Sequence, residues 1–261
     1  MKPPQLDSET ITHPSSPSAM ADGEETARVA IIAAWGVLIA TVIFTTMPAI
    51  DLAVSRYFLG ENGRFILADS DFWKTFRTIT LRGFAFWYVA ILVCGFWTWK
   101  SRKPILGLNW LKFMYLALCT IAGPLLLTNV LLKEHWGRWR PREVTNLGGT
   151  EEFTSPLDLS GTCADNCSFV SGEVSSMVML FISLAFVSTR LRPLFYGLTI
   201  VMGAFSAVLR VGQGGHFLSD TLFAAALMVL IAAGLYWLIF LGKNPVASET
   251  EVNWKRLIPG R

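Results

Sequence analysis

Charge is scarce in this chain, and so are clusters of the residues that usually bind metals. Only 16% of its 261 residues are charged, whereas 52% are hydrophobic and the mean hydropathy is +0.47. This composition excludes an ordinary soluble domain and is typical of a polytopic membrane protein. The chain has three histidines and four cysteines, and none lies with acidic residues at ligand spacing. The sequence therefore predicts no metal site and no cofactor.

Apolar segments of bilayer length account for most of the chain. A membrane-spanning helix needs roughly 17 to 25 mainly apolar residues. The segments that approach this length are Val29–Pro48, Gly83–Trp99, Phe113–Leu132, Val170–Ser188, Leu194–Leu209 and Phe217–Leu241. The sequence predicts an all-α bundle of six transmembrane helices, in which the fifth helix is short.

The two ends of the chain are predicted to be cytoplasmic tails. Residues 1–26 are polar, rich in Ser and Pro and without an apolar stretch, so we expect a disordered tail and not a cleaved signal. Lys and Arg in short loops mark the cytoplasmic face, and they follow the second, fourth and sixth segments. We therefore expect a tail at 1–26, a membrane domain at 27–242 and a second tail at 243–261. The other connections would face the periplasm of a bacterium, across its inner membrane.

Several polar residues are predicted to meet at the outer, periplasmic end of the bundle. They are Lys133 and Arg140 after the third helix, Ser171, Gly172 and Glu173 at the start of the fourth, Arg210 at the end of the fifth, and His216 and Asp220 at the start of the sixth. Ionisable groups at a bilayer are costly, and the packing of apolar helices does not require them. Their convergence indicates a functional site.

The residue types at this site suit phosphoryl transfer without a metal. Lys and Arg side chains stabilise the negative charge that spreads over a transferring phosphoryl group. Ser171 and Gly172 open a helix, where free backbone N–H groups favour an anion. His216 and Asp220 lie one helical turn apart, so the carboxylate can hold the imidazole tautomer that leaves the other ring nitrogen free to attack phosphorus.

Three motifs carry a resemblance to a known family. "KEHWGRWRP" fits KxxxxxxRP, "VSGE" stands in the place of PSGH, and "LRVGQGGHFLSD" fits SRxxxxxHxxxD. In this order the chain resembles the type 2 phosphatidic acid phosphatase (PAP2) superfamily over about residues 29–241. The resemblance implies a metal-independent lipid phosphatase in which His216 forms a phosphohistidine and Asp220 assists it. The phosphate-binding residues that it implies are Lys133, Arg140, Ser171, Gly172 and Arg210.

The chain also departs from the family pattern, and one departure changes the chemistry. Glu173 replaces the histidine that protonates the leaving oxygen, which leaves two interpretations: a general acid, or the structural partner of an arginine. Val170 and Leu209 replace a proline and a serine. The stretch "CSFVSGEVSS" resembles a proteobacterial subgroup similar to inner-membrane lipid A phosphatases, and this resemblance implies lipid A as the substrate.

Other functions stay open at this point. The alternative lipid substrates are undecaprenyl pyrophosphate, phosphatidylglycerophosphate and phosphatidic acid. A non-catalytic lipid-phosphate binder or transporter is an alternative of another class, whereas a vanadium haloperoxidase is disfavoured because those enzymes are soluble. The expected partners are the bilayer and a phosphorylated membrane lipid, with no nucleic acid, and the sequence predicts no oligomeric state.

A few residues near the site have two interpretations each. Arg138 and Arg142 are expected to be cations at the lipid headgroups, with contact to the substrate as the alternative. Cys163 and Cys167 lie four apart in the long outer loop, where either a disulfide or free thiols fit the spacing. An amphipathic stretch before the second helix is expected to turn Arg77 toward lipid phosphates.

Overall fold

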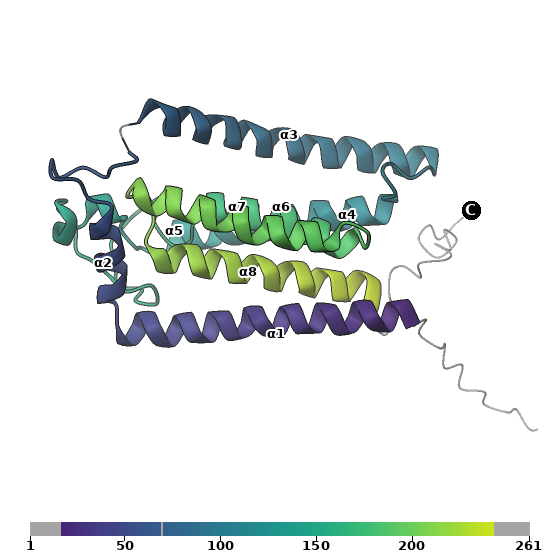
Figure 1. Cartoon of the computed structure of the whole chain (residues 1–261), viewed down its shortest axis with the longest axis horizontal. Helices are drawn as coiled ribbons and strands as arrows, with labels where there is room; N and C mark the ends of the chain where they lie inside the picture. The colour runs from purple at the N-terminus through teal and green to yellow at the C-terminus, as the bar shows by residue number, and fades with distance from the viewer. Residues whose placement is uncertain (1–16, 69, 243–261) are drawn as a thin grey trace, which may run out of the picture.

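The computed structural model describes residues 17–68 and 70–242. In these ranges the chain forms helices and a few isolated bridge pairs but no strand, which confirms the all-α prediction. Six apolar helical segments alternate in direction along the bundle (Figure 1). The described chain therefore begins and ends at the same end of the bundle.

The segments that run along the bundle are α1 (Pro17–Thr46), α3 (Asp71–Ser101), the continuous rod of α4 (Trp110–Thr120), η1 (Ile121–Leu132) and α5 (Lys133–His135), then α6 (Gly172–Val187), α7 (Arg192–Gly212), and α8 (Leu218–Tyr236) with its extension η4 (Trp237–Leu241). Short elements gather at the other end of the bundle from the termini (Figure 1). They are α2 (Ala49–Tyr57), η2 (Pro141–Glu143) and η3 (Thr145–Leu147).

One helix is shorter than a bilayer, but it is not the one that the sequence indicated. Five helices in the described ranges are long and apolar enough to cross a membrane, whereas α6 has 16 residues. The fifth segment, α7, runs for 21 residues, because Pro193 fits its first turn and the helix continues through Arg210 to Gly212. At 1.5 Å per residue α6 spans about 24 Å. It packs against α4, η1, α7 and α8. The chain is buried at Ser171, just before α6 begins, whereas it is exposed from Thr189 to Leu191, just after α6 ends.

The first helix begins earlier than predicted. α1 starts at Pro17, whereas the sequence placed the end of a disordered tail at residue 26. Arg192 at the start of α7 forms ion pairs with Asp22 at 2.8 Å and Glu25 at 2.5 Å, and these contacts hold the first turns of α1 against the bundle. The remainder of the two predicted tails, 1–16 and 243–261, lies outside the described residues.

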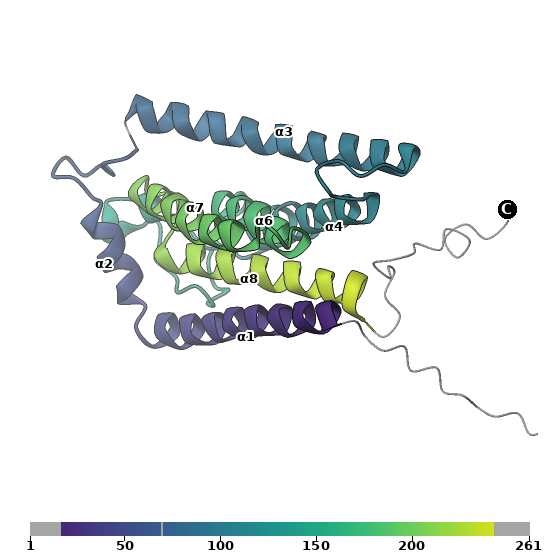
Figure 2. The same cartoon turned by 45° about the vertical axis from the view of Figure 1, so that its right-hand side comes forward.

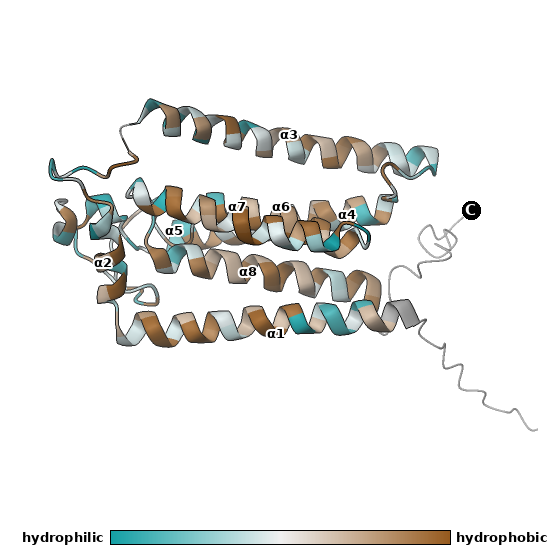
Figure 3. Cartoon of the chain, in the orientation of Figure 1, coloured by the Kyte–Doolittle hydropathy of each residue, from teal (hydrophilic) through white to brown (hydrophobic). Residues whose placement is uncertain are grey.

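The helices are arranged around α6. In both views α1 lies at one edge of the bundle and α3 at the opposite edge, with α4, α6, α7 and α8 between them (Figures 1 and 2). α1 packs on α8, and α3 packs on α4. Hydrophobic residues follow the helix bodies, and hydrophilic residues concentrate toward the two ends (Figure 3). The end of the bundle opposite the described termini therefore combines α2, the long loop before α6 and the starts of α6 and α8, which together hold the candidate site.

Candidate active site

His216 lies in the turn between α7 and α8 and is 2% exposed. Its Nδ1 is 2.6 Å from the carbonyl oxygen of Ser168. A carbonyl oxygen only accepts hydrogen bonds, so Nδ1 carries the ring hydrogen and Nε2 keeps its lone pair. Burial and the positive charges of Arg210, Lys133 and Arg140 lower the pKa of His216 well below 6.5. The imidazole is therefore neutral at neutral pH and can act as a nucleophile through Nε2.

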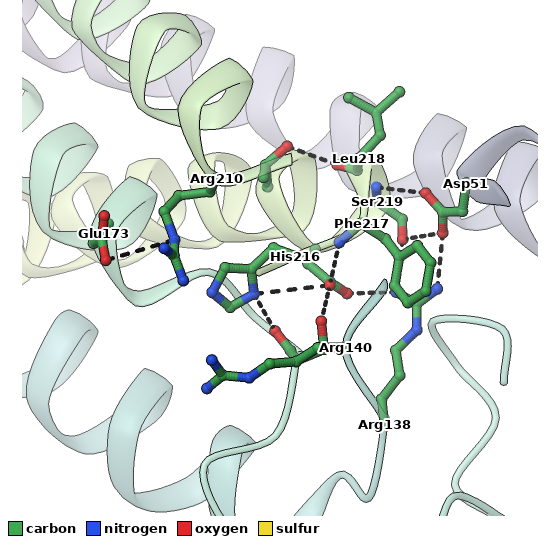
Figure 4. A network of polar contacts seen from close by, with 12 residues as sticks. Asp51, Arg138, Arg140, Glu173, Arg210, His216, Phe217, Leu218 and Ser219 are labelled. Atoms are coloured by element: carbon green, nitrogen blue, oxygen red, sulfur yellow. Dashed lines mark hydrogen bonds and ion pairs between the residues drawn. The ribbon is translucent and has the colours of Figure 1, made fainter. Parts of the chain in front are cut away.

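Cations surround this ring. It lies between the side chains of Arg210 and Arg140 (Figure 4). Arg210 Nη1 donates to the side-chain oxygen of Gln213 at 2.7 Å, and Arg140 donates to the carbonyl oxygen of Asn166 at 2.5 and 3.2 Å. Both acceptors are neutral and leave the charge of Arg140 uncompensated, whereas Arg210 also lies 3.5 Å from the Glu173 carboxylate. The arrangement suits an incoming anion.

The start of α6 contributes an unused donor beside the cations. Ser171 is the N-cap of α6, and its buried hydroxyl has no hydrogen-bond partner among the described residues. A Cβ atom at Gly172 would lie 3.1 Å from the Lys133 ammonium, and one at Gly215 would lie 2.5 Å from Arg210 Nη2. The two glycines let these cations approach the backbone closely. A helix start with a free hydroxyl and nearby cations favours a phosphate oxygen.

Glu173 forms ion pairs with two arginines. Its Oε1 accepts from Arg77 Nε at 2.6 Å and lies 3.5 Å from Arg210 Nε. Of the two interpretations that the sequence left open, these contacts favour the partner of an arginine. Arg77 comes from α3, far from the three motifs in sequence, and its side chain is 43% exposed. The predicted amphipathic stretch thus places one of its cations against the site itself.

Asp220 does not touch the imidazole directly, although the sequence indicated that it would hold the ring. The distance from its Oδ2 to His216 Nδ1 is 3.9 Å. Oδ2 instead accepts from the Ser168 hydroxyl at 2.5 Å and from the Phe217 N–H at 2.8 Å. The first turn of α8 leaves this N–H unpaired, so the carboxylate caps the helix. Asp220 therefore acts on His216 through Ser168.

Arg138 is the clearest correction to the sequence analysis. We expected a headgroup cation, but its side chain is fully buried. It pairs with Asp51 of α2 at 2.8 Å and with Asp220, and its guanidinium lies 4.3 Å from the ring centre of Phe217 (Figure 4). The sequence analysis did not identify Asp51 as a site residue. By contrast, Arg142 is exposed, as expected of a cation at the headgroups.

The outer loop supports the site from the other side. Cys163 and Cys167 form a disulfide, which settles the alternative that the spacing left open. The short bridged segment contains Asn166, whose carbonyl holds Arg140. In the described part of the chain, no group of His, Cys, Asp and Glu side chains is placed to hold a metal ion.

Comparisons with known proteins agree with this geometry. The family model of the PAP2 superfamily matches residues 112–243. The lipid A 4'-phosphatase of Rhizobium etli is 34% identical over 228 residues, which cover 76% of this chain and 82% of the relative. That of Rhizobium leguminosarum is 32% identical over 223 residues, covering 77% and 91%, and that of Francisella tularensis subsp. novicida is 28% identical over 214 residues, covering 78% and 93%.

No solved structure matches the chain. The match to the family model nevertheless contains all three motifs, and the structure brings their cations, the start of α6 and the imidazole together at one end of an apolar helical bundle. This multi-pass bacterial membrane protein therefore belongs to the PAP2 superfamily and is a phosphoric monoester hydrolase that acts on a membrane lipid.

Proposed function

We propose that this membrane lipid phosphatase removes the 4'-phosphate of lipid A, without a metal and through a phosphohistidine. The lipid and the position of the phosphate come from the relatives, which are named lipid A 4'-phosphatases. The catalytic route is supported by one observation above all. The imidazole of His216 is fixed by Ser168 so that Nε2 keeps its lone pair, and it lies between two arginines.

The proposed reaction has two displacements at phosphorus. In the first, the Nε2 lone pair of His216 forms an N–P bond, and the P–O bond to the sugar breaks with its electron pair on the leaving oxygen, which takes a proton from water. In the second, a water oxygen attacks phosphorus, its proton is lost to solvent, and the N–P electron pair returns to Nε2. Arg140, Arg210 and Lys133 stabilise the charge on the phosphoryl oxygens in both steps, and Ser171 and the start of α6 bind one of these oxygens.

Glu173 has a supporting role in this proposal. As the ion-pair partner of Arg77 and Arg210, it orients two guanidinium groups toward the substrate phosphate. It takes the place of the family's histidine in the motif, and its contacts are those of an ion-pair partner. Asp220 orients Ser168, and Ser168 orients the imidazole.

The proposed location is the bacterial inner membrane, with both ends of the chain in the cytoplasm and the site in the periplasm. Lys100 lies in the last turn of α3, and Arg102 and Lys103 follow it. This end of α3 is the end of the bundle where the described chain begins and ends (Figure 1), and short cationic loops favour the cytoplasmic side. The site lies at the opposite end of the bundle. An oxidising compartment also suits the disulfide of the outer loop.

The test is phosphate release by the purified chain in detergent with a chelator present. The substrates are lipid A, phosphatidic acid, phosphatidylglycerophosphate and undecaprenyl pyrophosphate, and mass spectrometry of the product identifies the phosphate that was removed. We expect release from lipid A that survives chelation and disappears in His216→Ala. His135→Ala is the matched control, because this histidine is exposed and should be dispensable.

Three outcomes would contradict the proposal. Faster release from one of the other lipids would change the substrate, and release that stops on chelation would contradict the metal-independent route. Binding of lipid A without release of phosphate from any lipid would favour the non-catalytic lipid-phosphate binder.

A further inference from the structure

A buried cluster near His216 contains more negative than positive charges. Two carboxylates, Asp51 and Asp220, share the single guanidinium of Arg138, and all three side chains are completely inaccessible. Arg138 also donates to the Ser219 hydroxyl at 2.8 Å and to the Thr154 carbonyl at 3.0 Å. In Figure 4 the Arg138 guanidinium lies against the Phe217 ring, and Asp51 lies on the side of Arg138 away from His216. The charges of the cluster sum to one negative charge.

Such a cluster is costly to bury, because carboxylates lose their hydration and one guanidinium offsets only one of them. A structural ion pair needs Arg138 and Asp220 alone. The second carboxylate, that of Asp51, is therefore not required for the ion pair. It accepts from the backbone N–H of Ser219 at 2.9 Å and from its hydroxyl at 2.5 Å, so α2 is fixed to the first turn of α8.

The excess negative charge lies beside the ring that becomes charged in the reaction. When Nε2 forms the N–P bond while Nδ1 keeps its hydrogen, the imidazole ring becomes cationic. The charged groups around His216 are the cations Lys133, Arg140 and Arg210, with the Glu173–Arg77 pair beyond them and Asp220 3.9 Å from Nδ1. The three cations repel a positively charged ring until a bound phosphate neutralises their charge. The Asp220 carboxylate of the buried cluster favours a positive ring, as does the Ser168 carbonyl that accepts from Nδ1.

We propose that Asp51 is a positioning residue for catalysis: its charge offsets that of Arg138, so that the Asp220 carboxylate remains available to stabilise the phosphorylated His216 ring. This role rests on the proposed phosphohistidine mechanism. Asp51 lies outside residues 112–243 that match the family model, so α2 supplies a part of the catalytic apparatus that the family motifs do not contain. Without Asp51, Arg138 and Asp220 would cancel each other.

The charge argument predicts an unusual pattern in two variants. Asp51→Asn keeps the shape of the side chain but leaves the cluster neutral, so we expect the rate of phosphohistidine formation to fall roughly ten- to a hundredfold, with KM nearly unchanged. The double variant Asp51→Asn with Arg138→Gln restores a single negative charge on Asp220. It should recover part of the lost rate, although it lacks more native contacts.

The measurements are acid-quenched trapping of phosphohistidine from radiolabelled lipid A, turnover, KM and the pH profile of kcat/KM, all in detergent. Because loss of a nearby negative charge disfavours the protonated imidazole, the acid limb of the Asp51→Asn profile should move to lower pH and move back in the double variant. Tyr115→Phe is the control for a lost buried hydrogen bond, since Tyr115 donates to the Ala232 carbonyl at 3.0 Å on α8, away from the site. It should keep the wild-type rate and pH profile.

The inference would be overturned by wild-type phosphohistidine formation in Asp51→Asn, or by a double variant slower than Asp51→Asn with an unmoved acid limb. If Asp51→Asn cannot be purified, the double variant decides: a loss of a hundredfold or more would refute the charge argument, and a smaller loss would support it. Inactivity of the wild-type chain on every lipid would instead refute the proposed function, so the two failures are distinguishable.

Discussion

Arg138 and Arg140 lie two residues apart in one motif, yet they belong to opposite kinds of site. Arg138 is completely buried and shared by two carboxylates. Arg140 bonds to a single neutral carbonyl, and its charge reaches His216. An arginine whose charge is balanced by two buried carboxylates serves the structure, whereas one held by a neutral acceptor keeps its charge for a ligand. Arg210, which contacts both Gln213 and Glu173, is intermediate between these cases. The contrast gives Arg138 and Arg140 separate tests.

The largest expected effect is loss of stability in Arg138→Ala. This substitution leaves two buried carboxylates without a cation, and breaking a buried ion pair from one side costs roughly 3–5 kcal/mol. Thermal unfolding in detergent should show a marked fall in Tm. Arg142→Ala removes an exposed arginine of the same loop and should leave Tm nearly unchanged. Equal melting temperatures for the two variants would show that Arg138 does not stabilise the fold more than an exposed arginine does.

Arg140→Ala should have the opposite effect: Tm should stay close to that of the wild type, and phosphate release should nearly stop. Loss of a preorganised charge contact with the phosphoryl group lowers turnover by roughly 10²–10³. Arg140→Lys should also fail, because an ammonium cannot bind two phosphate oxygens in the fork geometry of a guanidinium. Phosphate release and Tm are measured on the same preparations. A variant that melts early but turns over normally would show that Arg140 is a structural residue.

Glu173→Gln distinguishes the two interpretations of the altered motif. As a partner of Arg77 and Arg210, Glu173 orients them, and glutamine can still accept a hydrogen bond from either. Turnover should then stay within about tenfold of wild type, and Glu173→Ala should be worse. A general acid would instead lose roughly 10²–10⁴ in both variants. Steady-state kinetics on the two proteins therefore decides the role of this residue.

The smallest expected effect is the pH response of the wild-type protein. The pKa of His216 lies well below 6.5, so Nε2 stays unprotonated as the pH falls to 6.5, and the acid limb of kcat/KM should lie below this value. The unfolded chain binds this proton near 6.5, so the stability from a neutral His216 is complete above that pH and declines below it. An activity profile that already falls above pH 6.5 would contradict a depressed pKa, once ionisation of the substrate phosphate is allowed for.

The sequence predicted the helical bundle well, because bilayer-length apolar segments need no tertiary information to be recognised. Its errors lie at the ends of helices. α1 extends to Pro17 through ion pairs with Arg192, which no local pattern reveals. The shortness of α6 (Gly172–Val187) was also missed, because the apolar pattern from Val170 to Ser188 does not show where the helical backbone begins and ends.

The site was predictable where motifs carried it and unpredictable where partners came from elsewhere in the chain. The structure brings His216, Arg210, Arg140 and Lys133 together, and their catalytic roles stay predictions. The sequence analysis missed Asp51 because its partners are distant in sequence: Arg138 is 87 positions away and Ser219 is 168 positions away. One signal was present: an acidic residue in a short helix directly after a membrane span needs a partner when it is buried.

The length of α3 bears on how a lipid substrate reaches the site from the membrane. Its 31 residues span about 46 Å at 1.5 Å per residue, well beyond the roughly 30 Å of bilayer hydrocarbon. The surplus at the end where α3 begins carries Arg77, and in the proposed orientation it would place the phosphate-binding groups at the height of the headgroups of the outer leaflet. A substrate bound there would react while its acyl chains stay in the membrane, so the proposed enzyme would do no work to extract it.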